Sequence, residues 1–242
     1  MTNIVLRTLR GTGEPLEGGM LGDIVEACER MGVRHRPVQY HASIAPVGGT
    51  KMFHESYHDG WHRGAVADAE GIPSVWAAYS LGALIAGDLA AAGQLSNCIG
   101  LILLSDPNRH SKQIAPECRV NPAYYGCVDR RFIRAGYPVW QISVADDPIS
   151  ACSPTNGFRM LAAAVAGRPQ PPFHPGFLNI GETLSAVRRY LGTPPVGNTP
   201  ARPSRHVVYS TERMPGAQHI TYTKFAAMKA EEAIINYRKE IP

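Results

Sequence analysis

The stretch Ser-Val-Trp-Ala-Ala-Tyr-Ser-Leu-Gly-Ala-Leu-Ile-Ala, residues 74–86, constrains this 242-residue chain more than any other. A short apolar run of strand length ends at Ser80, and a helical pattern rich in small residues begins directly after it. A turn this tight needs small neighbours, and Ala78 and Gly82 stand two positions to either side of the serine. Such a turn lifts the hydroxyl clear of a sheet and directs the amino end of the new helix at developing negative charge.

The pattern small-x-Ser-x-Gly between a strand and a helix is the nucleophile elbow of α/β-hydrolases. On the pentapeptide alone, Ser80 as a solvated cap of an ordinary turn stays an alternative. The rest of the chain favours the first interpretation, because strand-like runs alternate with helical patterns. The strand-like runs cover residues 3–9, 36–44, 74–79, 99–104, 137–144 and 206–210. We therefore predict an α/β fold with a central parallel sheet that is flanked by helices.

Composition and charge exclude several classes of function. The net charge is +4, with no block of lysines and arginines, so nucleic-acid binding is not expected. No apolar run approaches the ~20 residues that cross a bilayer, and we expect no integral membrane segment. The first residues lack the parts of a secretion signal, so synthesis in the cytoplasm is expected. Five cysteines without a CxxC exclude a zinc knuckle, and Cys118 and Cys127 could close a loop only under oxidising conditions.

Residues 167–204 differ in composition from the rest of the chain. A breaker run, Gly-Arg-Pro-Gln-Pro-Pro, opens the segment at residue 167, and residues 192–204 are rich in proline and glycine. Between them, residues 181–191 have the pattern of a short amphipathic helix. This predicts a linker insertion over 167–204 in a core made of residues 1–166 and 205–242.

A second motif points to different chemistry. His54-Glu55-Ser56-Tyr57-His58 matches H-E-x-x-H, in which two histidines share a zinc ion and the glutamate is the general base. Gly60 interrupts the helix that such a site needs, and the flanks lack a long apolar helix. We interpret residues 51–71 as a polar helix or loop and predict no metal site.

A serine hydroxyl attacks an acyl carbon only if a base takes its proton and a carboxylate orients that base. In α/β-hydrolases the chain order is serine, acid, histidine. After Ser80, the candidate acids are Asp146 and Asp147, which follow a predicted strand, and the candidate base is His219, which precedes the last helix. The residues alone do not decide which of the two aspartates is the acid.

The same chemistry needs two donors for the oxyanion. The backbone N–H of Leu81 is one by position. Thr12, in the glycine-rich turn after the first strand, is the second candidate, although it could also be an ordinary turn residue. None of these groups requires a cofactor.

Short stretches of the chain resemble cutinases. The resemblance rests on an oxyanion loop, an elbow, an acid motif and a histidine loop. These stretches are Arg-Gly-Thr-Gly-Glu-Pro at 10–15, Ala-Tyr-Ser-Leu-Gly-Ala at 78–83, Asp-Pro-Ile at 147–149, and His219 followed by Tyr222. The resemblance favours Asp147 as the acid, although Asp146 stands where cutinases have a glycine.

About seventy residues separate Asp147 from His219, far more than in cutinases. Three features resemble the lysin B family: this insertion, the loop at residues 105–109 and the missing signal peptide. Lysin B proteins are esterases of phages that infect mycolic-acid-bearing bacteria. The resemblance implies a cutinase-like α/β-hydrolase, a monomeric serine esterase that cleaves mycolic acids from arabinogalactan after release onto the cell envelope. The alternatives are a generic cutinase or lipase acting on short- to long-chain esters, and a wall-binding module without activity.

Overall fold

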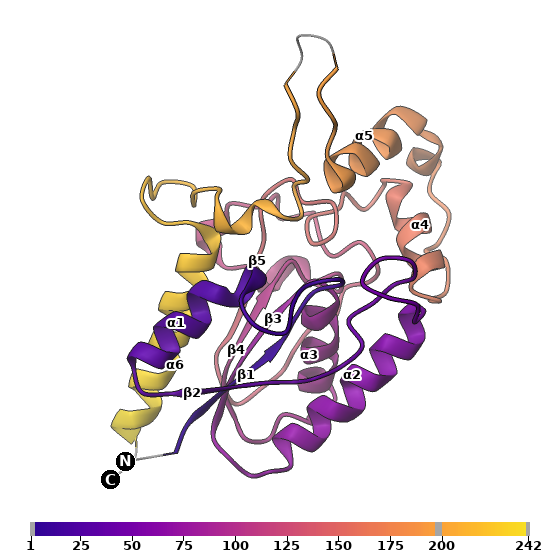
Figure 1. Ribbon diagram of the computed structural model, residues 1–242. Coiled ribbons are helices and arrows are strands. Elements are labelled where there is room, and N and C mark those ends of the chain that lie inside the picture. Colours follow the sequence, from indigo (N-terminus) through magenta and orange to yellow (C-terminus); the bar gives the residue numbers. More distant parts are fainter. Residues whose placement is uncertain (1–2, 197–199, 241–242) are drawn as a thin grey trace.

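The computed structural model describes residues 3–196 and 200–240 (Figure 1). Its centre is a sheet of five parallel strands in the order β2-β1-β3-β4-β5. The strands are β1 (Val5–Leu9), β2 (Arg34–Pro37), β3 (Ser74–Tyr79), β4 (Cys98–Leu104) and β5 (Val139–Ile142). The predicted α/β class with a helix-flanked parallel sheet is confirmed.

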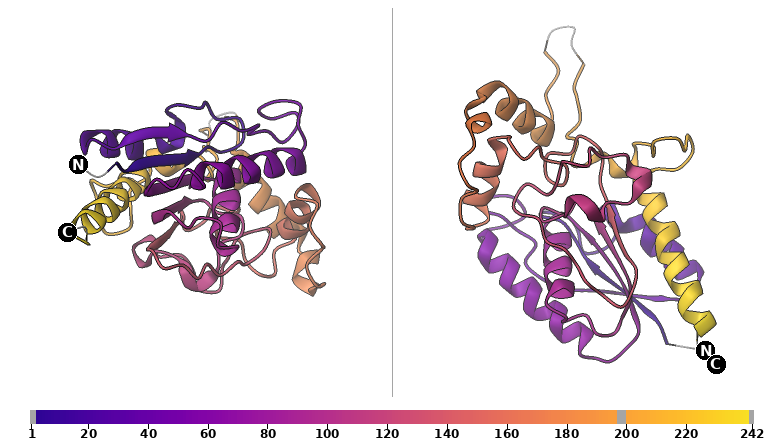
Figure 2. Two further views of the ribbon diagram at one scale, coloured as in Figure 1. Left: turned by 90° about the horizontal axis from the view of Figure 1, so that it is seen from below. Right: turned by 180° about the vertical axis from the view of Figure 1, so that it is seen from behind.

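Helices cover both faces of the sheet (Figures 1 and 2). One face packs against α1 (Gly22–Arg30) and α6 (Tyr222–Glu240), and the other packs against α2 (Phe53–Asp68) and α3 (Leu81–Ala91). Alternate residues of β3 separate into the two cores, with Val75 and Ala77 on the first face and Trp76 and Ala78 on the second. A strand that is buried on both faces has an unbroken apolar sequence, so β3 and β4 can be recognised from the sequence.

The remaining helical elements are short or lie in the insertion. They are η1 (Gly19–Leu21), η2 (Ser111–Gln113), η3 (Pro116–Cys118), α4 (Phe158–Val165), η4 (Pro175–Leu178), α5 (Ile180–Leu191) and η5 (Val208–Ser210), where η marks a 3₁₀ turn. The predicted strand at residues 206–210 is therefore wrong, because η5 occupies this segment. Its alternating apolar residues pack as a single turn above the sheet instead of pairing with a strand.

The segment with the H-E-x-x-H motif forms one continuous helix, α2, in spite of Gly60. A Cβ at this glycine would lie 2.7 Å from Ile85 and 2.8 Å from Tyr40, so the missing side chain allows close packing. His54 and His58 are exposed on the outer side of the helix. Within residues 3–196 and 200–240, the structure contains no group of three or more histidine, cysteine or acidic side chains placed to hold a metal ion.

Helices α4 and α5 lie beyond the end of the sheet to which the strands point (Figures 1 and 2). They meet in a small apolar cluster that includes Phe158, Ala186 and the buried thiols of Cys127 and Cys152. All five cysteines are free and buried, so Cys118 and Cys127 are not paired. Residues 197–199 of the predicted insertion lie outside the described part of the chain. No helix in the described part is both long and apolar enough to cross a bilayer.

Candidate active site

The turn between β3 and α3 consists of Ser80 alone. Its backbone has φ 56° and ψ −118°, a conformation that costs a non-glycine residue about 1–3 kcal/mol. The Ser80 N–H donates to the carbonyl of Leu104 over 3.0 Å, which holds the turn in place. A Cβ on Gly82 would lie 2.0 Å from the carbonyl oxygen of Leu9, so only glycine lets α3 approach β1 this closely. The sequence-predicted elbow is therefore built as a strained, tightly packed turn.

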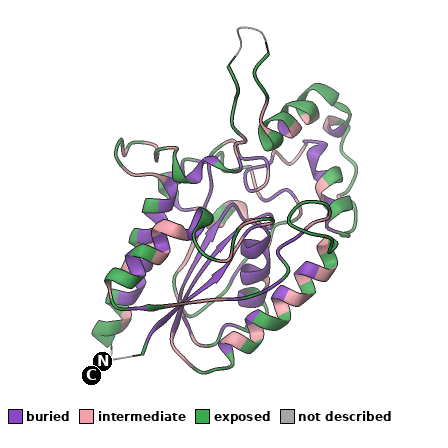
Figure 3. Cartoon of the chain, in the orientation of Figure 1, coloured by how far each residue is buried: buried purple, intermediate pink, exposed green. Residues whose placement is uncertain are grey.

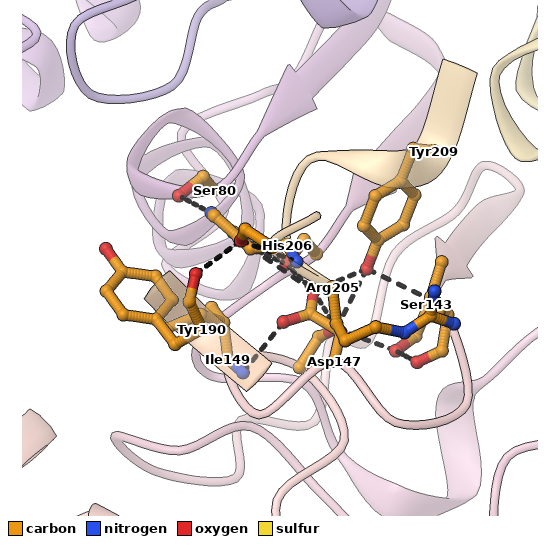
Figure 4. A network of polar contacts seen from close by, with 12 residues as sticks. Ser80, Ser143, Asp147, Ile149, Tyr190, Arg205, His206 and Tyr209 are labelled. Atoms are coloured by element: carbon orange, nitrogen blue, oxygen red, sulfur yellow. Dashed lines mark hydrogen bonds and ion pairs between the residues drawn. The ribbon is translucent and has the colours of Figure 1, made fainter. Parts of the chain in front are cut away.

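The imidazole of His206 lies next to this serine (Figure 4). Its Nε2 is 2.8 Å from Ser80 Oγ, and its Nδ1 is 3.3 Å from Asp147 Oδ2 and 2.9 Å from Ser105 Oγ. Serine, histidine and aspartate therefore form one continuous chain of hydrogen bonds.

The structure corrects the predicted histidine, because His206 takes the place next to Ser80 that was expected for His219. His219 is exposed in the loop before α6, and its side chain makes no hydrogen bond within the described part of the chain. The two histidines share a signal, since each is followed three residues later by a tyrosine, Tyr209 or Tyr222. Nothing local in the sequence separates the two stretches.

Of these two tyrosines, only Tyr209 contacts Asp147. The hydroxyl of Tyr209 donates to Asp147 Oδ2 over 2.6 Å, because η5 turns His206 and Tyr209 toward the same carboxylate. Tyr222 lies instead in the first turn of α6 and packs edge-on against Tyr209, with 5.7 Å between ring centroids.

The carboxylate of Asp147 is fully buried and surrounded by donors. Ser105 and Tyr209 donate to Oδ2, and the Ile149 N–H donates to Oδ1 over 3.0 Å. Burial alone would raise the pKa of this carboxyl, but the charge of His206 and the hydrogen bonds hold it below its usual value. The group is therefore ionised at neutral pH.

Of the two candidate aspartates, Asp147 is the one that contacts His206. Asp146 is 45 % exposed at its side chain, and its Oδ1 accepts from Arg205 Nε over 2.7 Å. Arg205 also forms a paired contact with Glu212. Asp146 therefore anchors the segment that carries His206 without touching the imidazole.

The hydrogen-bond network assigns the tautomer of His206. A carboxylate only accepts, so Ser105 gives its one hydroxyl proton to Asp147. The Ser105 oxygen must then accept from His206, which places the imidazole proton on Nδ1. Nε2 is left with a lone pair that faces the Ser80 hydroxyl, as a general base requires.

Both serines that contact His206 have a positive φ, 56° at Ser80 and 51° at Ser105. They differ in access, because Ser105 is fully buried and its proton is held by Asp147. Ser80 is only partly buried and stands at the start of α3, where helix amides point toward incoming charge. Only Ser80 is placed to meet a substrate. The contact of Ser105 with His206 and Asp147 could not be predicted from sequence, because it depends on the neighbouring ends of β4 and β5.

Two tyrosine rings flank the imidazole. Tyr79, the residue before Ser80, stacks on His206 with 5.0 Å between centroids, and its hydroxyl donates to the His206 carbonyl over 2.6 Å. Tyr190 of α5 approaches at 5.6 Å with a tilt of 50°. Gly11 makes room for Tyr79, since a Cβ there would lie 2.6 Å from the ring. The imidazole is thus held between β3 and α5.

The predicted oxyanion donors lie on the same side of the sheet. Leu81 is the first residue of α3, where an N–H has no partner within the helix. The turn that carries Thr12 is fixed by Glu14, whose carboxylate accepts from the N–H of Gly11 over 2.9 Å and of Met20 over 2.8 Å. The roles of Leu81 and Thr12 stay predictions.

Comparison with known proteins agrees with this fold. No family model and no curated protein matches the chain. Among solved structures, lysin B from Mycobacteriophage D29 is 17% identical, with a TM-score of 0.62, covering 96% of this chain and 99% of that one. An acetylxylan esterase is 17% identical, with a TM-score of 0.49, covering 79% of this chain and 100% of that one. A cutinase-like protein from Cryptococcus sp. is 18% identical, with a TM-score of 0.43, covering 62% of this chain and 79% of that one. The chain therefore has an α/β-hydrolase fold like that of lysin B.

Replacing each histidine separately tests which one is the base. His206→Ala should lower kcat for a soluble p-nitrophenyl ester by roughly 10⁴-fold to 10⁶-fold, as expected for loss of a triad base. His219→Ala is the matched control and should stay within about twofold of wild type. The opposite pattern would show that His219 takes this place in the working protein.

The hydroxyl of Tyr209 should be measurable as a positioning group. Tyr209→Phe removes a hydrogen bond to a charged group, worth about 1.5–3 kcal/mol, and should lower kcat by about tenfold to a hundredfold with little change in KM. It should also raise the pKa of Asp147, because the carboxylate loses a donor, and the pH–rate profile should show a greater loss of activity than wild type at its acid end. Tyr222→Phe, another buried tyrosine, should leave rate and profile unchanged. Equal effects of the two substitutions would indicate a general packing role.

Proposed function

We propose that this protein is a serine ester hydrolase in which Ser80 is the nucleophile, His206 the general base and Asp147 the acid that orients it. The observation that carries the proposal is the continuous path from Ser80 Oγ to His206 Nε2 and from His206 Nδ1 to Asp147, at 2.8 and 3.3 Å. It starts at a strained serine between a buried strand and a helix. A serine or a histidine with only a structural role would need neither this hydrogen-bonded path nor a strained turn.

The first half of the reaction forms an acyl-enzyme. His206 Nε2 takes the Ser80 proton as the oxygen bonds to the ester carbonyl carbon, and the carbonyl oxygen becomes an oxyanion. The N–H of Leu81 and the donors of Thr12 stabilise this charge. Asp147 stabilises the imidazolium directly and through Ser105. The carbon–oxygen bond to the alcohol then breaks, and His206 gives its proton to the departing oxygen.

The second half repeats these steps with water. His206 removes a proton from a water molecule, whose oxygen attacks the acyl carbon, and the bond to Ser80 breaks. The carboxylic acid leaves, and the proton returns to the serine. Protein groups and water balance every step, so the reaction needs no cofactor or metal.

For the natural substrate, we propose the ester that joins mycolic acids to arabinogalactan. The likeness in fold to lysin B over 96% of the chain and the insertion between acid and histidine support this choice. The protein would act as a monomer on the cell envelope after synthesis in the cytoplasm. The alternative is a cutinase- or lipase-type carboxylesterase, and mycolate release from purified cell walls, compared with model esters of increasing chain length, separates the two.

Covalent inhibition tests the reaction class. A serine-reactive phosphonate should abolish ester hydrolysis and add one label to Ser80, whereas EDTA should leave the rate unchanged. Ser80→Ala should lower kcat on the order of 10⁶-fold, the loss typical of a missing nucleophile. Loss of activity with EDTA and resistance to the phosphonate would instead favour a metal site at His54 and His58. A folded protein that hydrolyses no ester would favour the wall-binding module.

A further inference from the structure

Exposed apolar side chains gather on one part of the molecule. The described part of the chain has 17 large apolar side chains that are exposed, and eleven of them fall within the 48 residues from 160 to 207. They are Met160, Leu161, Val165, Phe173, Leu178, Ile180, Leu184, Tyr190, Leu191, Val196 and Val207. Figure 3 shows exposed residues along α4 and α5 and in the segments around them. We call this surface, formed by residues 158–196 and 200–207, the insertion face.

Helix α5 shows the pattern in one element. Ile180, Leu184 and Leu191 are 70 %, 49 % and 70 % exposed and recur at spacings of four and seven residues, so they form a stripe along the helix. The packed side of the helix is different, because Ala186 is buried against the cluster that contains Phe158. A surface helix normally turns polar residues outward. The outer stripe of α5 therefore has no partner within the described structure.

The insertion face also carries an excess of positive charge. Residues 158–205 contain six arginines and one acidic residue, Glu182, a net charge of +5, whereas the whole chain carries +4. Three of these arginines have partners within the chain, since Arg159 is buried, Arg168 pairs with Asp88, and Arg205 pairs with Asp146 and Glu212. The other three are exposed, and they are Arg188, Arg189 and Arg202. Exposed cations and apolar side chains thus share the same surface.

This surface is joined to the catalytic histidine. The N–H of Arg205 donates to the carbonyl of Arg189 over 2.7 Å, and the hydroxyl of Ser204 donates to the carbonyl of Tyr190. The ring of Tyr190 lies 5.6 Å from that of His206 (Figure 4). The carboxyl end of α5 is therefore part of the wall of the site.

We propose that the insertion face docks onto an anionic lipid surface and so brings the site to esters held in that surface. Apolar side chains of α4 and α5 enter the acyl boundary while arginines meet headgroup phosphates, the combination that holds amphipathic helices at interfaces. Charge decides against a second copy of this chain, because two surfaces with an excess of arginine repel each other. The inference rests on the proposed ester hydrolysis for its purpose, but the binding can be measured separately.

Vesicle flotation with the full chain tests the docking. We expect the protein to float with phosphatidylglycerol vesicles and to bind pure phosphatidylcholine vesicles at least about tenfold more weakly, with added salt weakening the first interaction. The double variant Ile180→Ser/Leu184→Ser and the charge reversal Arg202→Glu, both outside the carboxyl end of α5, should each reduce binding about tenfold or more. The matched control Val66→Ser/Ile235→Ser removes apolar side chains that are 55 % and 43 % exposed on α2 and α6, and it should bind as wild type does.

Hydrolysis of a soluble p-nitrophenyl ester reports whether each variant is folded, and it should be unchanged in all of them. Failure of wild type to bind either vesicle, equal binding to both lipids, or wild-type binding by both insertion variants would overturn the proposal. A dimer in solution that the same variants dissociate would assign the surface to a second copy instead. Ser80→Ala should still float. Vesicle binding by a wild type that hydrolyses no ester would overturn the proposed function and leave the docking intact.

Discussion

A single carboxylate removed from water, that of Asp147, is the constraint on which the rest of the site depends. Burying an unpaired ion costs several kcal/mol, so the charge persists only because donors converge on it. The donors come from separate places, with Ser105 directly after β4, Ile149 beyond β5, and His206 and Tyr209 on either side of the start of η5. Satisfying one charge therefore brings together segments that are more than a hundred residues apart in sequence.

The same arrangement explains why the imidazole is so closely held. Its ring lies on Tyr79, its backbone carbonyl accepts the Tyr79 hydroxyl, and its Nδ1 faces Asp147 and Ser105. Because Tyr79 precedes Ser80, the strand that leads to this serine also holds the imidazole of His206. Relative motion of the two side chains is limited by this shared support, and the proposed acyl transfer needs a preorganised pair of this kind.

Helices α4 and α5 contribute to this architecture as well as to the surface. Helix α4 packs against α5, and carbonyls at the end of α5 accept hydrogen bonds from the Ser204 hydroxyl and the Arg205 N–H. A ligand that engages the outer side of α5 would therefore act on an element that contacts His206 through Tyr190. The composition of residues 167–204 marks the proline-rich ends of this segment, whereas the contact between the helices depends on the folded chain.

How much could be predicted from sequence follows from how local each feature is. The elbow at Ser80 could be predicted, since its turn is determined by the small residues beside it. Strands β3 and β4 could be predicted because they are buried on both faces and are therefore continuous apolar runs. The edge strand β2 (Arg34–Pro37) is polar and partly exposed, and the strand predicted at residues 36–44 overlaps it by only two residues. Asp147 could be placed with the help of the family resemblance. His206 could not be separated from His219, because each begins a stretch with a tyrosine three residues on, and only the path of the chain after α5 decides between them.

The central claim is that Ser80, His206 and Asp147 act as one unit, and a crystal structure of the protein after reaction with a serine-reactive phosphonate tests it most directly. We expect phosphorus bonded to Ser80 Oγ, with His206 Nε2 within hydrogen-bond distance, about 3 Å, of an oxygen of the adduct. Asp147 should remain on the other side of the imidazole. An adduct on Ser105, or an adduct on Ser80 that faces His219, would contradict this arrangement.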